Sequence, residues 1–177
     1  IKIASIDLNY YQLHDKIINF KLPTLISTGM GSSEEIAQTV NFYKKKKHNK
    51  IILLHCNSLY PPKNDQINLR NILFFQKKFR VLTGLSDHTA DNYNAFASVA
   101  LGAKVIEKHI TLNKKYKGPD HPFAIEPHEM KNLMYGIRKI EESLGFYERR
   151  LSLSEKLNRK MIRRSIVSKS FIKKNDK

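Results

Sequence analysis

The chain has 177 residues, and 32 Lys and Arg against 16 Asp and Glu give it a formal net charge of +16. Hydrophobic residues make up 41% and aromatic residues 10%, a composition that suits a packed domain and excludes a disordered polycation. No run approaches the roughly 18 apolar residues that a membrane span needs, and no signal-peptide pattern occurs, so we expect a soluble cytoplasmic protein. The single cysteine, Cys56, excludes an intrachain disulfide framework and a cysteine-based zinc site.

Five short apolar runs alternate with amphipathic segments along the chain. They span residues 1–6, 24–27, 51–56, 81–85 and 105–110. This spacing is typical of repeated βα units around a parallel sheet. The first run has no methionine before it, so we expect the chain to be a piece of a longer protein.

Helix signals mark the segments between and after these runs. Ser32 and Glu35 form a capping box, and Gly102 suits the left-handed end of a later helix. Pro127 opens a longer amphipathic helix that Gly145 closes.

The pattern changes after this last helix. Residues 147–161 are polar and charged, as in a linker, and residues 163–168 alternate like a short strand. We therefore predict a partial α/β domain over residues 1–146, a linker over residues 147–161 and the truncated start of a second domain over residues 162–177.

Five parallel strands permit two closures. One is an open doubly wound sheet, and the other is the last five strands of an eight-stranded TIM barrel whose first three strands lie upstream. Both closures place function at the carboxyl ends of the strands, so the polar residues there decide the chemistry.

Two histidines follow neighbouring predicted strands. Because side chains alternate along a strand, Ser86 and His88 share one face, and Glu107 and His109 share one face of the next strand. Two imidazoles with a carboxylate nearby match the ligands of a divalent ion such as manganese, zinc or iron. We expect His88 and His109 to bind a metal, with Asp87 in a position to orient an imidazole.

Other polar groups at the strand ends predict an anionic substrate. They are Lys2 and Ser5 after the first run, residues 27–29 after the second and residues 57–60 after the third. A lysine, hydroxyl groups and a glycine turn before a helix are the groups that hold phosphate or carboxylate. His55 and Cys56 lie within an apolar run, which favours a structural role for both.

Several segments, in order along nearly the whole chain, resemble the sialic acid synthase family. Gly-Leu-Ser-Asp-His-Thr at residues 84–89 and Val-Ile-Glu-Lys-His at residues 105–109 are the most specific. The others are residues 2–5, 25–30, 53–56, 60–61, 68–70, 100–103, 118–121 and 126–127. Residues 163–165 also resemble the start of the antifreeze-like (SAF) domain that follows the barrel in that family.

The resemblance implies an α/β fold, a partial TIM barrel with strands four to eight, and the start of an antifreeze-like domain from residue 162. It also implies condensation of phosphoenolpyruvate with an N-acylated hexosamine, such as N-acetylmannosamine, to give a nine-carbon 2-keto sugar acid and phosphate. Sialic, legionaminic and pseudaminic acid synthases share this scaffold.

The resemblance also implies roles for ten residues. His88 and His109 match the metal ligands, with Mn²⁺ expected and Mg²⁺ or Co²⁺ as alternatives. The remaining residues match substrate-binding positions (Lys2, Ser5, Ser58, Tyr60 and Ser86) and catalytic positions (Asp7, Glu107 and Asp120). Asp7 stands where relatives often have Glu.

The resemblance implies a domain-swapped homodimer for the full-length protein, and we expect the fragment alone to be inactive. Composition suggests a rival, a basic nucleic-acid-binding protein. The basic residues of this chain, however, are scattered over helix ends, loops and the linker, and no RNP-like aromatic motif occurs. We therefore expect no nucleic-acid partner and no membrane partner.

Overall fold

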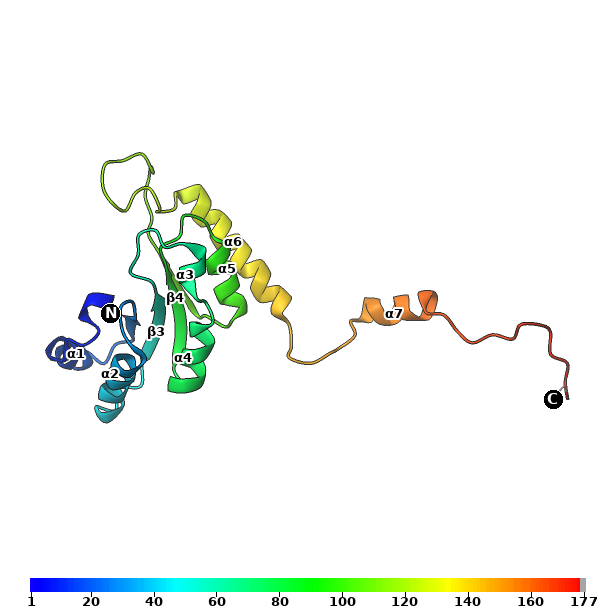
Figure 1. Ribbon diagram of the computed structural model, residues 1–177. Coiled ribbons are helices and arrows are strands. Elements are labelled where there is room, and N and C mark those ends of the chain that lie inside the picture. Colours follow the sequence, from blue (N-terminus) through cyan, green and yellow to red (C-terminus); the bar gives the residue numbers. More distant parts are fainter. Residues whose placement is uncertain (176–177) are drawn as a thin grey trace. The chain divides into compact units, whose positions relative to one another are not determined.

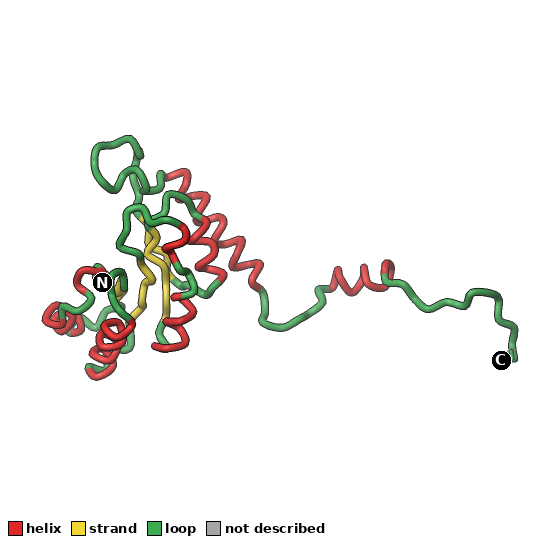
Figure 2. Tube along the Cα trace, viewed as in Figure 1, coloured by secondary structure: helices red, strands yellow, loops and turns green. Residues whose placement is uncertain are grey.

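The computed structural model describes residues 1–175 and divides into two compact units, Ile1–Leu144 and Gly145–Lys177. The first unit is built on a five-stranded sheet with helices packed against it (Figures 1 and 2). Its strands are β1 (Lys2–Ile3), β2 (Thr24–Ser27), β3 (Ile51–Cys56), β4 (Leu82–Asp87) and β5 (Val105–Lys108). Each overlaps one of the predicted apolar runs.

The strand order distinguishes the two closures. All four pairings are parallel, and the strands follow one another as β1-β2-β3-β4-β5. In a doubly wound sheet, the order in which strands are added reverses at a switch point. In a barrel, each new strand is added on the same side of the previous one. The unbroken order confirms the partial barrel.

The register separates the sheet into two faces. One row of cross-strand partners, Ile3, Ile26, Leu53 and Thr83, belongs to the face that the helices cover. The residues on the other face would point into a closed barrel. One row of cross-strand partners on this inner face is Cys56, Ser86 and Glu107. Polar side chains therefore gather on the inner face, at the carboxyl ends of the strands.

Helices cover the outer face. They are α1 (Tyr11–Ile18), α2 (Ser33–Lys45), α3 (Asn64–Ile67), α4 (Asn71–Phe79), α5 (Tyr93–Ala100) and α6 (Pro127–Leu144), and a short 3₁₀ helix, η1 (Ser5–Asp7), follows β1. Tyr43 of α2 and Phe75 of α4 pack with Leu53 of the sheet in the largest hydrophobic core. A separate cluster joins α5 and α6.

The predicted helix signals are confirmed. The side chain of Ser32 accepts a hydrogen bond from the Glu35 backbone, and the Glu35 carboxylate accepts one from the Ser32 backbone. Pro127 is the first residue of α6. Gly102 and Gly145, which follow α5 and α6, have φ values of 93° and 54°, the left-handed region that glycine enters without strain.

The second unit differs from the sequence-based expectation in two respects. The predicted linker contains a helix, α7 (Leu153–Ile162), which begins with a capping box formed by Ser152 and Glu155. Residues 163–168 form no strand, because a strand needs a hydrogen-bonded neighbour and none lies beside them in the described part of the chain. The last two residues of the predicted second domain, 176–177, lie outside the described residues.

None of the helices in residues 1–175 combines the length and the apolar character that crossing a membrane requires.

Candidate active site

A pocket of about 420 Å³ lies at the carboxyl ends of the strands. Eight of the ten predicted site residues line it: Lys2, Ser5, Ser58, Tyr60, Ser86, His88, Glu107 and His109. They come from four strands or the loops that follow them. The parallel sheet therefore brings together residues that are more than 100 positions apart in the sequence.

A charged and hydroxylic cluster forms one part of the pocket. Ser86 on β4 donates a hydrogen bond of 2.7 Å to Glu107 Oε1 on β5. Lys2 Nζ on β1 lies 3.6 Å from the same oxygen, and both side chains are about one-third exposed, at 34% and 38%. A cation and a hydroxyl group thus face the pocket beside a carboxylate that can accept a proton.

The two predicted metal-binding histidines lie beside each other, with ring centroids 5.2 Å apart. His88 is buried, and its Nδ1 lies 2.9 Å from the Asn57 carbonyl oxygen. Because a carbonyl can only accept, Nδ1 carries the proton, and Nε2 keeps a free lone pair. Burial lowers the pKa of His88, which favours this neutral form.

Aromatic rings pack around the histidine pair. The centroid of the Tyr60 ring lies 4.3 Å from the centroid of the His88 ring and 6.2 Å from that of the His109 ring. Phe123, which is 3% exposed, lies edge-on to His109 at 5.1 Å and also contacts Tyr60. No local pattern in the sequence links Phe123 to the site, because its contacts are all distant along the chain.

The pocket offers two imidazole nitrogen donors, His88 and His109, of the kind that divalent transition metals accept. Among residues 1–175, no three or more His, Cys, Asp or Glu side chains converge to hold a metal ion. His88 and His109 would therefore act as a pair, with the other coordination positions left to water or substrate oxygen. Catalytic sites keep such open positions, whereas structural sites fill them with protein ligands.

Asp120 lies at the edge of the histidine pair rather than in the pocket lining. Its Oδ2 is 3.8 Å from His109 Nδ1, and its side chain is 59% exposed. The loop that carries it is held by a hydrogen bond of 2.7 Å between Thr111 and His121, and by Lys114, whose Nζ lies 2.6 Å from Glu129. The loop is therefore fixed at both ends while Asp120 faces solvent.

Asp7 is not among the residues that line this pocket. It is the last residue of η1, and its carbonyl oxygen accepts a hydrogen bond from His14 Nε2 at 3.0 Å. The 3₁₀ turn after β1 directs the chain away from the pocket at this point. Ser5, the first residue of the same turn, does line the pocket.

The turn after β2 brings Ser5 and Ser58 together. The Gly29 backbone N–H donates to Ser5 Oγ at 3.0 Å. A Cβ atom at Gly29 would overlap Ser58 Oγ and lie 2.8 Å from Ser5 Oγ. The absence of a side chain at residue 29 is thus what allows both hydroxyl groups to lie against the Gly29 backbone.

Ser27 belongs to the polar strand ends from which the sequence predicts an anionic substrate, although it is not among the ten residues with assigned roles. It is 2% exposed and lines the pocket, and its hydroxyl oxygen has no hydrogen-bond partner among the described residues. A buried hydroxyl without a partner is unfavourable by about 1–3 kcal/mol, so a ligand in the pocket is the natural partner.

Asp87 makes no direct hydrogen bond to either imidazole, so the predicted contact with an imidazole is wrong. Its carboxylate lies on the outer face of the sheet, where Lys108 Nζ approaches Oδ2 to 2.8 Å. His88 instead donates to the backbone of Asn57. Side chains at 87 and 88 alternate across the strand end, and this alternation separates them.

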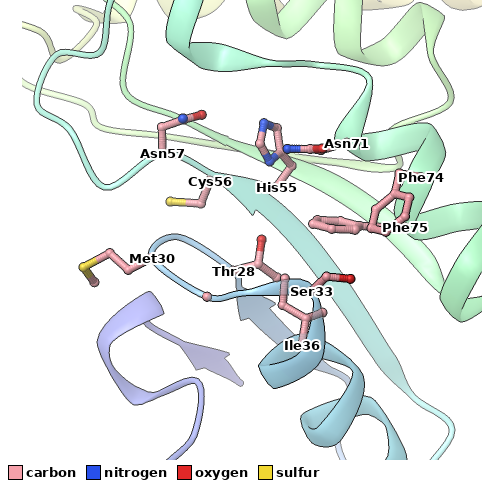
Figure 3. Close-up of a pocket in the computed structure, with 11 residues that line it drawn as sticks. Thr28, Met30, Ser33, Ile36, His55, Cys56, Asn57, Asn71, Phe74 and Phe75 are labelled. Atoms are coloured by element: carbon pink, nitrogen blue, oxygen red, sulfur yellow. The ribbon is translucent and has the colours of Figure 1, made fainter.

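A second pocket, of about 220 Å³, lies beside the first and shares Met30 and Cys56 with it (Figure 3). His55 lines it, but its Nε2 lies 2.5 Å from the Ile67 carbonyl oxygen, and burial lowers its pKa. No lysine, arginine or carboxylate lines this pocket. The structural roles expected for His55 and Cys56 agree with this setting.

Residues 1–149 match the NeuB family. The chain belongs to this family. It is 38% identical over 177 residues to the N,N'-diacetyllegionaminic acid synthase of Campylobacter jejuni, with 99% of this chain and 53% of that protein covered. It is 36% identical over 169 residues to the human N-acetylneuraminate-9-phosphate synthase, with 95% of this chain and 47% of that protein covered.

Structural similarity agrees with membership of the NeuB family. The N-acetylneuraminic acid (sialic acid) synthetase of Leptospira borgpetersenii serovar Hardjo-bovis, solved in complex with citrate, superposes with a TM-score of 0.83 at 34% identity. This match covers 93% of the chain and 58% of the solved protein. The chain spans about half the length of the curated NeuB-type relatives given above.

Proposed function

We propose that the natural protein condenses phosphoenolpyruvate with the open-chain aldehyde of an N-acylated hexosamine. The products are a nine-carbon 2-keto sugar acid and inorganic phosphate. The observation that carries this proposal is the single pocket that combines Lys2 and four serine hydroxyl groups with the adjacent His88 and His109. Family membership supports it, because the relatives are named as synthases of sugar acids.

The anionic substrate is assigned to the side of the pocket that carries Lys2. Its ammonium group and the hydroxyl groups of Ser5, Ser58 and Ser86 would bind the phosphate and carboxylate of phosphoenolpyruvate. The same donors stabilise the negative charge that collects on phosphate as it leaves.

His88 and His109 would hold a divalent ion, Mn²⁺ in the first place and Mg²⁺ or Co²⁺ as alternatives. When bound, the ion supplies Lewis-acid polarisation of the sugar aldehyde. The Asn57 carbonyl fixes the His88 tautomer, and Tyr60 and Phe123 restrict the rotation of both imidazoles.

The chemistry balances with two carboxylates. The methylene carbon of phosphoenolpyruvate forms a bond to the aldehyde carbon, and the aldehyde oxygen takes up a proton. Water then adds to the cationic C2 and loses a proton, which leaves a hydroxyl group on C2. This hydroxyl becomes the 2-keto group as the C–O bond to phosphate breaks, and its proton passes to the leaving phosphate. Glu107 and Asp120 are the carboxylates near the two histidines that could move these protons, and Asp7, outside the pocket, is assigned no transfer.

The hexosamine is proposed as N-acetylmannosamine or a related N-acylated sugar, since the relatives include legionaminic and sialic acid synthases. We also propose that residues 1–146 are the second part of a TIM barrel, 147–161 a connecting segment that holds all but the last residue of α7, and 162–177 the start of an antifreeze-like domain. A domain-swapped homodimer in the cytoplasm completes the proposal.

The proposal is tested by assaying the full natural chain with Mn²⁺, phosphoenolpyruvate and a panel of N-acylated hexosamines. We expect phosphate release that requires one of the sugars, and a keto acid of the summed mass in equal amount. Phosphate release without any sugar, or no release with every sugar, would contradict it.

A further inference from the structure

A buried ion pair joins the ends of β4 and β5 on the outer face of the sheet. Asp87 and Lys108 are direct cross-strand partners, and Lys108 Nζ lies 2.8 Å from Asp87 Oδ2. Both side chains are only 1% exposed. The Thr89 backbone N–H and hydroxyl donate to the other carboxylate oxygen at 3.0 and 2.7 Å, and Lys108 also donates to the Thr89 carbonyl at 2.6 Å.

The pair stands directly before both histidines. Asp87 precedes His88, and Lys108 precedes His109. Because side chains alternate, the ion pair faces the helices while the imidazoles face the pocket. The two strands are thus tied together one residue before the point at which each presents its imidazole.

We propose that Asp87 and Lys108 are positioning residues for the histidine pair. Their bond, with that of Thr89, sets the separation and direction of the two strand ends, and thereby keeps the His88 and His109 rings 5.2 Å apart. A buried ion pair is a weak source of stability, since well-packed apolar residues often replace one without loss. The position of the Asp87–Lys108 pair beside both imidazoles indicates that it orients them rather than stabilises the fold. The inference deepens the metal site of the proposed function and rests on it.

The test compares two double variants of the full natural chain. Asp87→Asn with Lys108→Met removes both charges and leaves no buried ion unpaired. The control, Gln76→Met with Thr83→Val, removes a side-chain hydrogen bond of 3.0 Å that joins α4 to β4 on the same face of the sheet, near the other end of that strand. The Mn²⁺ dissociation constant is measured by electron paramagnetic resonance, and the thermal midpoint by circular dichroism.

We expect Asp87→Asn with Lys108→Met to weaken Mn²⁺ binding roughly 10- to 100-fold, as loss of outer partners of metal ligands does. The control should keep wild-type Mn²⁺ affinity, and Lys108→Arg, which preserves the pair, should keep most of it. Equal Mn²⁺ affinity in the folded double variant and the wild type would overturn the inference, as would an equal loss in the control.

If the double variant shows no cooperative thermal transition, Asp87→Glu takes its place, because it keeps both charges and changes only their separation. We expect it to weaken Mn²⁺ binding by about tenfold, and unchanged affinity would overturn the inference. The assay is independent of turnover. If the wild-type chain makes no sugar acid but the variant still binds Mn²⁺ more weakly than the wild type, the proposed reaction is wrong and the positioning role stands.

Discussion

The hydroxyl group of Ser86 donates a hydrogen bond of 2.7 Å to the carboxylate of Glu107. The two residues are cross-strand partners on β4 and β5, so the bond follows from the register of the sheet. Lys2 reaches the same carboxylate from the far strand of the unit, at 3.6 Å. Glu107 therefore links the groups assigned to phosphoenolpyruvate with the strand that carries His109.

Glu107→Gln should lower phosphate release about 10²- to 10⁴-fold, because an amide cannot accept the proton that a general base takes. The amide oxygen can still accept from Ser86, so we expect the thermal midpoint to change little. Steady-state phosphate release with both substrates measures the effect. Glu142→Gln, which alters an exposed pair with Lys139 on α6, is the matched control and should keep full activity.

Ser27→Ala should raise the KM for phosphoenolpyruvate by about tenfold, which corresponds to the loss of one hydrogen bond to a charged group. The free energy of unfolding should stay the same or rise, since the variant removes a buried hydroxyl group without a protein partner. Ser98→Ala removes a buried serine that donates to the Ala95 carbonyl at 2.7 Å, away from the pocket. Ser98→Ala should lower the free energy of unfolding and leave the KM for phosphoenolpyruvate unchanged. If Ser27→Ala instead lowers the free energy of unfolding and leaves KM unchanged, Ser27 does not belong to the site.

Gly29→Ala should impair substrate binding more than folding. Its methyl group would displace the hydroxyl groups of Ser5 and Ser58, which can rotate, and would leave the surrounding backbone in place. We expect a raised KM for phosphoenolpyruvate and a thermal midpoint close to that of the wild type. Gly136→Ala provides the contrast, because its methyl group would press on the Phe96 ring and lower the free energy of unfolding by about 1–3 kcal/mol.

Stability should fall as the pH drops below about 6.5, partly because of His14. This residue is fully buried, with Nε2 donating to the carbonyls of Asp7 and Leu8 and Nδ1 accepting from the Tyr43 hydroxyl. Burial lowers its pKa, so the unfolded chain takes up the proton first as the pH falls. The stabilisation is complete above the unfolded pKa and is lost as the pH falls towards the folded one.

Urea unfolding at pH 7.5 and 5.0 measures this dependence. His14→Gln should reduce the difference in unfolding free energy between the two pH values, at the expense of lower stability at pH 7.5. His128→Gln changes an exposed histidine and should leave the difference as it is. If His14→Gln shows the same difference in unfolding free energy between pH 7.5 and 5.0 as the wild type, the lowered pKa of His14 does not contribute to the pH dependence of stability.

Much of the fold could be predicted because its signals are local. The apolar run at residues 51–56 and the bounds of β3 coincide, and the Ser32 capping box marks the start of α2. The convergence of His88 and His109 was predicted from strand alternation together with a barrel in which both strand faces point inward. By contrast, α7 was taken for a linker because its residues are highly charged, although the capping box of Ser152 and Glu155 was a visible signal.

The parts that could not be predicted depend on pairing across the fold. Lys108 was assigned no role, and Asp87 was assigned to the wrong neighbour, because only the register of β4 and β5 makes them partners. Phe123 reaches the histidines through a loop whose path no local pattern determines. Asp7 lies in a 3₁₀ turn after β1, a local detail that strand alternation does not determine.

Phosphate release by His88→Ala and His109→Ala shows whether the two histidines carry the reaction, when it is measured in the full natural chain with phosphoenolpyruvate, the accepted hexosamine and Mn²⁺. We expect wild-type release to depend on both substrates and on Mn²⁺, and we expect each variant to lose it while keeping the wild-type far-ultraviolet circular dichroism spectrum. Undiminished release in both folded variants would contradict the claim that this pocket and its two histidines carry the reaction.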